Sequence, residues 1–285
     1  MTVAVIVDSA ASLPPALAQR WGVRVVPLQV IVDAASYDEG VGIDADTVLA
    51  RLTEGAAVTT SQPTPGAFDA AIADAVAAGA DAVVIVTISG RLSGTAEVAR
   101  IAATQAAVPV EVVDSRTLAM AEGFAAIAAA DAARAGRGLA EVAAAARETA
   151  ARSRCVFTVD TLEFLRRGGR ITPAVATAGK ILGIRPVLEI VDGEVTLAAR
   201  VRSTARARAA LLAMVDDALA GCEHPAVSVM SVGEPSVGDD AALAIEARFP
   251  GAGSVVRTPV SAVLAVHTGP GTLAAVVVDL PRALG

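Results

Sequence analysis

Residues 82–95 read Ala-Val-Val-Ile-Val-Thr-Ile-Ser-Gly-Arg-Leu-Ser-Gly-Thr, an almost unbroken apolar run followed by a polar turn. A short β-branched run of this kind is typical of a strand buried on both faces, as in a parallel sheet. The turn leads into an alanine-rich segment that we expect to be a helix. The stretch therefore predicts a strand, a turn and a helix in succession, which is the repeating unit of an α/β fold.

The same order is found on both sides of this stretch. Towards the N-terminus, residues 3–7 predict a buried strand that ends in Asp8-Ser9, a helix opens at Leu13-Pro14-Pro15, and residues 23–32 predict another strand region. Towards the C-terminus, residues 110–113 predict a strand that ends in Asp114-Ser115. This alternation predicts a parallel sheet with helices on both faces.

The second half of the chain has a different character. Two alanine-rich helices, at about 117–135 and 139–152, precede it. Beyond them we expect a hairpin across Val191-Asp192-Gly193-Glu194, a helix over 203–220, and strands at 227–232, 254–257 and 274–278. We therefore predict a two-lobed α/β protein, with an N-terminal domain at 1–154 and a C-terminal mixed-sheet domain at 155–285, and a ligand between or near both lobes.

Composition and charge limit the class of protein. The formal net charge of −7 disfavours binding to nucleic acid, because phosphate backbones are repelled. Apolar residues make up 54% of the chain, but no run approaches the roughly 18 to 20 residues that a membrane-spanning helix needs. The N-terminus reads as a first strand rather than a leader, and two cysteines are too few for a disulfide framework. We expect a cytoplasmic protein.

Hydroxyl-rich segments recur where strands are expected to end and helices to begin. They are Asp8-Ser9, Thr59-Thr60-Ser61, Ser93-Gly94-Thr95 and Asp114-Ser115. Such positions bind ligands in α/β sheets, and helix N-termini with Ser and Thr donors suit a carboxylate or phosphate. Each segment taken alone is also an ordinary helix cap. Four on one edge favour an anion site.

One histidine lies close to a glycine-rich segment. His267 precedes Thr268-Gly269-Pro270-Gly271 and follows an apolar run that we expect to be a strand. Its imidazole can donate to an anion and can change charge near physiological pH, or it can bond to local backbone. With Ser93 and an aspartate such as Asp8 or Asp114 it could also form a hydrolase triad, which is the alternative function. Cys222-Glu223-His224 is too small a cluster for a metal site, so we expect none.

Arginines cluster in two places in this acidic chain. They are Arg166, Arg167 and Arg170, and then Arg200, Arg202, Arg206 and Arg208. The simpler interpretation is a solvated helix face with pairs at i, i+4. The alternative is a docking surface for an acidic partner or for its nucleotide phosphates.

Several motifs, taken in order, resemble one family. They are Val7-Asp8-Ser9 with Leu13-Pro14, the segment 60–65 (Thr-Ser-Gln-Pro-Thr-Pro), the segment 88–95, Val113-Asp114-Ser115, the segment 162–171 (Leu-Glu-Phe-Leu-Arg-Arg-Gly-Gly-Arg-Ile), Arg185-Pro186 and the segment 267–271. Together they span essentially the whole chain and resemble the DegV family, whose members include the fatty-acid-binding (FakB) subunits of bacterial fatty acid kinase. Arg185 stands where Lys is common, and Phe164 where another apolar residue is frequent.

The resemblance implies a function and a set of residues. It implies a non-enzymatic, lipid-binding protein that buries a palmitate-like fatty acid and presents its carboxylate to a separate kinase, with transient membrane contact for lipid exchange. Ligand-binding residues carried over by position are Thr60, Ser61, Ser93, Gly94, Thr95 and His267, and the partner-binding residues are Arg170 and Arg202. No residue of this chain is expected to be catalytic. ATP and magnesium would belong to the partner, which would resemble a dihydroxyacetone kinase and form an acyl phosphate.

Overall fold

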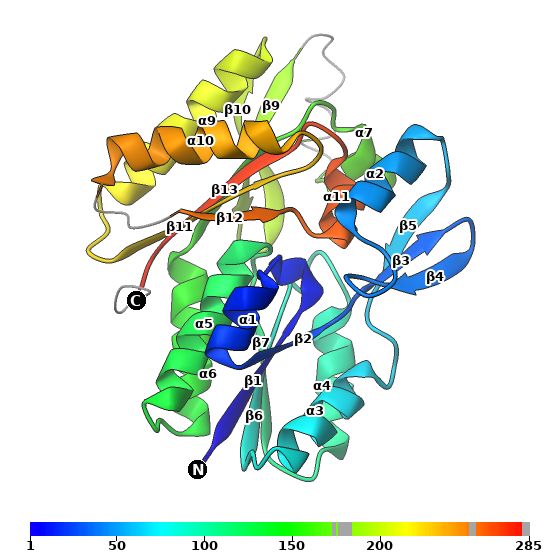
Figure 1. Cartoon of the computed structure of the whole chain (residues 1–285), viewed down its shortest axis with the longest axis vertical. Helices are drawn as coiled ribbons and strands as arrows, with labels where there is room; N and C mark the ends of the chain where they lie inside the picture. Colours follow the sequence, from blue (N-terminus) through cyan, green and yellow to red (C-terminus); the bar gives the residue numbers. More distant parts are fainter. Residues whose placement is uncertain (173–174, 176–183, 251–254, 281–285) are drawn as a thin grey trace.

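The N-terminal half forms a four-stranded, all-parallel sheet in the computed structural model, which describes residues 1–172, 175, 184–250 and 255–280 (Figure 1). The strand order is β2-β1-β6-β7. The strands are β1 (Val3–Asp8), β2 (Val23–Val26), β6 (Ala82–Thr87) and β7 (Val110–Asp114). The predicted parallel sheet is confirmed.

Helices cover both faces of this sheet, as the continuous apolar runs require. Along β6, Val83 and Ile85 face one layer, and Val84 and Val86 face the other. The first layer is α3 (Ala67–Ala77) and α4 (Thr95–Gln105), and the second is α5 (Met120–Arg134) and α6 (Leu139–Arg152). A short 3₁₀ turn, η1 (Ser9–Ala11), and α1 (Pro15–Trp21) follow β1.

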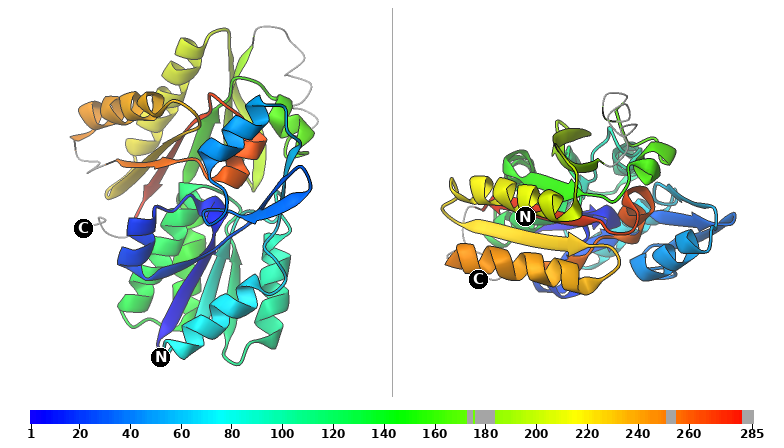
Figure 2. Two further views of the ribbon diagram at one scale, coloured as in Figure 1. Left: turned by 45° about the vertical axis from the view of Figure 1, so that its right-hand side comes forward. Right: turned by 90° about the horizontal axis from the view of Figure 1, so that it is seen from above.

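The C-terminal half forms a six-stranded mixed sheet, as predicted. Its order is β10-β9-β8-β13-β11-β12, and all neighbours are antiparallel except β11 and β12. The strands are β8 (Arg154–Thr158), β9 (Arg185–Val191), β10 (Glu194–Val201), β11 (Pro225–Ser231), β12 (Val256–Pro259) and β13 (Leu273–Asp279). On one face lie α9 (Thr204–Leu219) and α10 (Pro235–Arg248) (Figure 2). The division into two domains at 154 stays a prediction.

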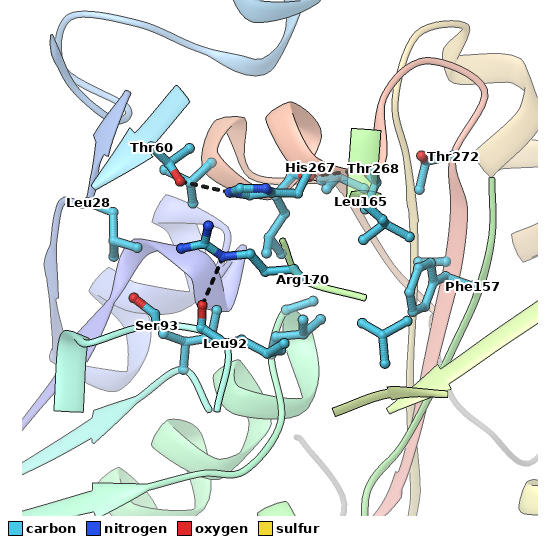
Figure 3. Close-up of a pocket in the computed structure, with 18 of the residues that line it drawn as sticks. Leu28, Thr60, Leu92, Ser93, Phe157, Leu165, Arg170, His267, Thr268 and Thr272 are labelled. Carbon is cyan, nitrogen blue, oxygen red and sulfur yellow. Dashed lines mark hydrogen bonds between the residues drawn. The ribbon is translucent and has the colours of Figure 1, made fainter. Parts of the chain in front are cut away.

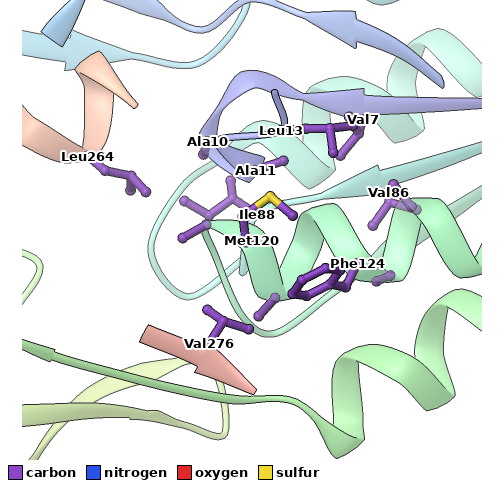
Figure 4. Packing of buried hydrophobic residues seen from close by; sticks show 14 of the residues in the cluster. Val7, Ala10, Ala11, Leu13, Val86, Ile88, Met120, Phe124, Leu264 and Val276 are labelled. Atoms are coloured by element: carbon purple, nitrogen blue, oxygen red, sulfur yellow. The ribbon is translucent and has the colours of Figure 1, made fainter. Parts of the chain in front are cut away.

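Helix α5 fills the space between the two sheets. Residues Met120 to Ala130 are all buried in it. Figure 4 shows Met120 and Phe124 between Val7 and Val86 of the parallel sheet and Val276 of β13. A helix covered on several sides needs small side chains so that the layers can approach, and this explains the alanine-rich sequence.

A third, smaller sheet joins the halves. Its order is β4-β3-β5, all antiparallel, with β3 (Gln29–Val32), β4 (Ala35–Asp38) and β5 (Val58–Ser61). Helix α2 (Ala45–Thr53) packs against α11 (Ala262–Thr268) of the C-terminal half. Segments far apart in the sequence therefore lie side by side here, above the carboxyl ends of the parallel strands (Figure 1).

The structure corrects three local predictions. The apolar run before His267 is helix α11, not a strand, because Ser261 caps it by accepting from the Leu264 N–H, and short apolar runs do not distinguish the two. Residues 59–61 belong to strand β5 rather than a turn. The expected strand region 23–32 is two strands of different sheets, β2 and β3. The hairpin at 191–194 and the helix near 203–220 are confirmed, while Ser254 lies outside the described residues.

Candidate ligand-binding cavity

A cavity of about 240 Å³ lies where the two large sheets, the small sheet and α11 meet. Apolar side chains line most of it, and its base is formed by Cys155 and Phe157 of β8, Met230 of β11 and Ala274 of β13. We call these four residues the apolar end. No charged residue is among them, so this end can bury an aliphatic chain but cannot satisfy polar groups.

The opposite side of the cavity carries hydroxyl, amide and basic groups. We call it the polar end and define it as Thr60, Ser61, Gln62, Ser93, Gly94, Arg170 and His267. Figure 3 shows Thr60, Ser93, Arg170 and His267 gathered on one side, with Phe157 and Thr272 on the other. The structure thus brings together five of the six predicted ligand residues; Thr95 lies buried just behind them.

Thr60 and His267 form the central hydrogen bond of the polar end. The Thr60 Oγ1 to His267 Nε2 distance is 2.7 Å. The other ring nitrogen, Nδ1, is buried and has no partner among the described residues. A proton there would be a buried donor without an acceptor, so we infer that it resides on Nε2 and is donated to Thr60. The Thr60 hydroxyl is then free to donate its own hydrogen into the cavity.

The surroundings of His267 favour the neutral form of its imidazole. Burial, together with the positive charge of Arg170, lowers the pKa of His267 to about 4. The expected response of the His267 charge to a bound carboxylate stays a prediction. The ring itself is strongly desolvated. The reason is that the last turn of α11 is covered on the side of Gly168, where even a Cβ atom would overlap the imidazole.

Arg170 lies at the cavity, not on an outer face. Its Nε donates to the Leu92 carbonyl at 3.1 Å, and its Nη1 donates to the Gly168 carbonyl. No carboxylate pairs with it among the residues that the structure describes. An uncompensated guanidinium beside neutral hydroxyls favours an anionic ligand group. The prediction of Arg170 as a partner-binding residue remains untested, but its place is in the cavity wall.

Ser93 is held by its neighbours at the start of α4. Its Oγ lies 2.8 Å from the Thr95 Oγ1. Gly94 leaves room for the Gln62 side chain, which occupies the position that a Cβ atom would take. The Ser93 and Thr95 hydroxyls therefore lie together at a helix N-terminus, a kind of position that can bind an anion.

The aspartates of the other two hydroxyl-rich segments accept hydrogen bonds from backbone N–H groups. Asp8 accepts from the Ala10 N–H at 2.9 Å and from the Ile88 N–H at 2.8 Å. Asp114 accepts from the Gly90 and Arg116 N–H groups at 3.1 and 2.9 Å. Neither aspartate, nor Ser9 or Ser115, lines the cavity. Asp8 is therefore the N-cap of η1, as the capping interpretation has it, whereas Asp114 holds the turns after β6 and β7 and caps no helix.

The hydrolase alternative finds no support in this arrangement. His267 Nε2 bonds to Thr60, whereas Ser93 bonds to Thr95, so a nucleophile-to-base hydrogen bond is not formed between them. Asp8 and Asp114 are occupied by backbone N–H groups and do not orient the imidazole. Among the described residues, no three side chains of His, Cys, Asp or Glu lie close enough together to hold a metal ion.

Sequence reasoning missed the contacts that fix α11. A Cβ atom at Gly269, which has φ of +74°, would overlap the Phe164 ring, and one at Gly168 would overlap His267. The glycines let α7 (Glu163–Arg167) and α11 approach closely. The glycines at 168 and 269 were the only hint of this close packing in the sequence. The sequence does not show that Gly168 lies against His267 or that Gly269 lies against Phe164.

The second predicted partner-binding residue, Arg202, is exposed just after β10. Among the helices that the structure describes, none is long and apolar enough to cross a membrane.

The fold and the cavity define a class: a two-sheet α/β protein with an apolar cavity whose polar end can hold an anion. Comparison with known proteins identifies the family. Residues 2–280 match the family model described as "Uncharacterised protein, DegV family", and the chain belongs to this family. It is 38% identical over 275 residues to a DegV domain-containing protein of Streptomyces coelicolor, covering 96% of this chain and 98% of the relative.

Solved structures agree with this assignment. A DegV family protein from Thermus thermophilus, described for its fatty acid binding, is 34% identical, with a TM-score of 0.88 and coverage of 98% of this chain and 100% of that one. A DegV lipid-binding protein from Thermotoga maritima is 25% identical, with a TM-score of 0.84 and coverage of 99% and 100%. The fold is therefore the one shared by these relatives.

Proposed function

We propose that this chain binds one long-chain fatty acid, with its tail at the apolar end of the cavity and its carboxylate at the polar end. The observation that carries the proposal is that one cavity combines an apolar face with neutral hydroxyl donors and with Arg170, which has no carboxylate partner among the described residues. Fatty acid binding by the Thermus thermophilus relative, whose structure this chain matches over nearly its whole length, supports it.

Burial of the tail should contribute more binding free energy than the hydrogen bonds to the carboxylate. Burying a 16-carbon chain contributes on the order of 10 kcal/mol gross, at about 0.8 kcal/mol per methylene, before the costs of association. Thr60 and Ser93 contribute hydrogen bonds to the carboxylate of about 1 to 3 kcal/mol each. The tail supplies most of the affinity, and the polar end supplies the position.

We further propose that the bound carboxylate is the substrate of a separate ATP-dependent kinase in the cytoplasm. In that reaction a carboxylate oxygen attacks the γ-phosphorus of ATP, the bond to the β-γ bridging oxygen breaks, and the products are an acyl phosphate and ADP. ATP and magnesium would be held by the partner. This chain would hold the nucleophile in place and keep the tail out of water.

Arginine residues outside the cavity are the proposed contacts to that kinase. Arg202 is exposed, and its guanidinium has no ion-pair partner among the described residues. We expect Arg202→Ala to lower acyl phosphate formation about tenfold while the dissociation constant for fatty acid stays unchanged, because a rim charge acts on association with the partner. Trapping the acyl phosphate with hydroxylamine measures the first quantity.

The control is Arg100→Ala, an exposed arginine on α4 that pairs with Glu97. It should leave both quantities unchanged. Equal acyl phosphate yields from Arg202→Ala and wild type would remove Arg202 from the docking surface. Absence of any acyl phosphate with the organism's own kinase would contradict the kinase partnership and leave fatty acid binding as a separate claim.

A further inference from the structure

A buried carboxylate lies where the small sheet meets the start of α11. Glu39 follows β4 and is 7% exposed. Its Oε1 accepts from the Val263 N–H at 2.9 Å, and its Oε2 accepts from the Ser9 hydroxyl. One side chain thus links the N-terminal half to the helix that carries His267.

The same carboxylate is also connected to Leu28, another residue that lines the cavity. The Ser9 Oγ accepts from the Leu28 N–H at 2.9 Å, and the Glu39 N–H donates to the Leu28 carbonyl at 3.0 Å. Leu28 and Val263 both line the cavity. Glu39 and Ser9 therefore bond to two segments that line the cavity without lining it themselves.

Helix α11 transmits this constraint to the polar end. The Ser261 N–H donates to the Ser12 Oγ at 3.0 Å, so the first turn of α11 is held by Glu39 and by Ser12. His267 lies in the last turn of the same seven-residue helix. Seven residues at about 1.5 Å each form a rigid unit about 10 Å long, so a shift of the first turn moves the imidazole.

Burying the carboxylate of Glu39 costs folding free energy, so packing alone does not explain this residue. No cation pairs with it among the described residues, and Asp8 and Glu122 are acidic neighbours. Burial raises the pKa of Glu39, and hydrogen bonds from Ser9 and Val263 oppose that rise. A buried carboxylate usually stabilises a fold less than an apolar side chain of similar size, which favours a role in positioning.

We propose that Glu39 is a positioning residue for the ligand site. Through the first turn of α11 it holds His267 against Thr60, so that the Thr60 hydroxyl hydrogen points to the ligand carboxylate. This inference rests on the fatty acid site proposed above, and it assigns a role to a side chain that does not touch the ligand.

The binding test uses the full chain and palmitate. Glu39→Ala should weaken palmitate binding about tenfold, the size of one lost hydrogen bond to a charged group. Glu97→Gln, an exposed glutamate on α4, is the matched control and should have no effect. In a His267→Ala background, Glu39→Ala should cause no further loss, because its effect passes through the imidazole. An equal loss in both backgrounds would overturn the proposal.

A second measurement does not depend on any ligand. The chain has two histidines, so the ring nitrogens of His267 can be followed by NMR with His224 as an internal reference. Wild type should show one tautomer with the proton on Nε2, and Glu39→Ala should show a mixture of tautomers. Unchanged His267 signals in Glu39→Ala would refute the positioning role, whether or not palmitate binds.

A second variant covers the case in which Glu39→Ala does not fold. If Glu39→Ala does not fold, Glu39→Gln, which keeps the size and one acceptor for Val263, takes its place with a smaller expected effect of about threefold. Wild type that binds no fatty acid would contradict the proposed function, and the NMR comparison would still decide the role of Glu39.

Discussion

The two ends of the cavity are built differently. The apolar end is a face of one regular sheet, with Cys155 and Phe157 on β8, Met230 on β11 and Ala274 on β13. The polar end is assembled from four segments: strand β5, the turn before α4, the segment after α7 and the last turn of α11. The apolar end should therefore set how much tail fits, whereas the polar end depends on the relative position of separate segments.

The largest effect should come from filling the apolar end. Ala274→Phe places a ring where about five methylene groups of the tail would lie, which costs about 4 kcal/mol, close to a thousandfold in palmitate affinity. Octanoate, which needs less of the cavity, should bind with little change. Isothermal titration with both acids measures the difference.

Overpacking is the competing explanation for such a loss. A thermal melt of Ala274→Phe therefore accompanies the titration, since overpacking costs about 1 to 3 kcal/mol of stability and would weaken both acids equally. Unchanged palmitate binding would show that the tail does not reach Ala274, and would break the contrast between the two ends.

A smaller effect should appear at the polar end as a pH dependence. The pKa of His267 is near 4 in the folded protein and near 6.5 when unfolded. As pH falls below 6.5, the unfolded state takes up a proton at this residue that the folded state does not, so the contribution of His267 to the unfolding free energy falls. Between pH 7 and pH 5 the loss from this residue should be about 2 kcal/mol.

His267→Gln isolates that contribution. The variant keeps every other titrating group, so the difference in unfolding free energy between wild type and variant, measured in urea at pH 7 and pH 5, should shrink by the stated amount. An equal difference at both pH values would mean that His267 titrates normally and that the polar end is open to solvent.

The smallest effect should follow from removing one hydroxyl donor. Ser93→Ala should weaken palmitate binding about tenfold, because one hydrogen bond to a carboxylate contributes about 1.5 kcal/mol. Thr104→Ala, which removes an exposed hydroxyl bonded to the Ile101 carbonyl of α4, should have no effect. Palmitate affinity equal to wild type in Ser93→Ala would exclude Ser93 from the head site.

The sequence predicted the fold well where burial leaves a local pattern. The run Ala82–Thr87 is apolar because both faces of the parallel sheet are covered, and the alanines of α5 reflect its place between two sheets. The failures lie in short segments. Helix α11, which includes His267, has only seven residues, too few for a period to show, and only the Ser261 cap indicated it.

The site was predicted in part, for a similar reason. Thr60, Ser93 and His267 were found from residue type and from the family resemblance. The position of Arg170 in the cavity wall was not predicted, because the carbonyls of Leu92 and Gly168 that fix its side chain are not encoded by any local pattern. Glu39 gave no signal at all, since its partners Ser9 and Val263 are distant in the sequence.

The most direct test of the central claim is to identify what the protein carries. The purified recombinant chain would be denatured and extracted with organic solvent, and the extract quantified by mass spectrometry beside an extract of Ala274→Phe. The account predicts one long-chain fatty acid per wild-type chain and a shorter or absent one in the variant. Wild type that is reproducibly empty, and that also fails to take up added palmitate, would contradict it.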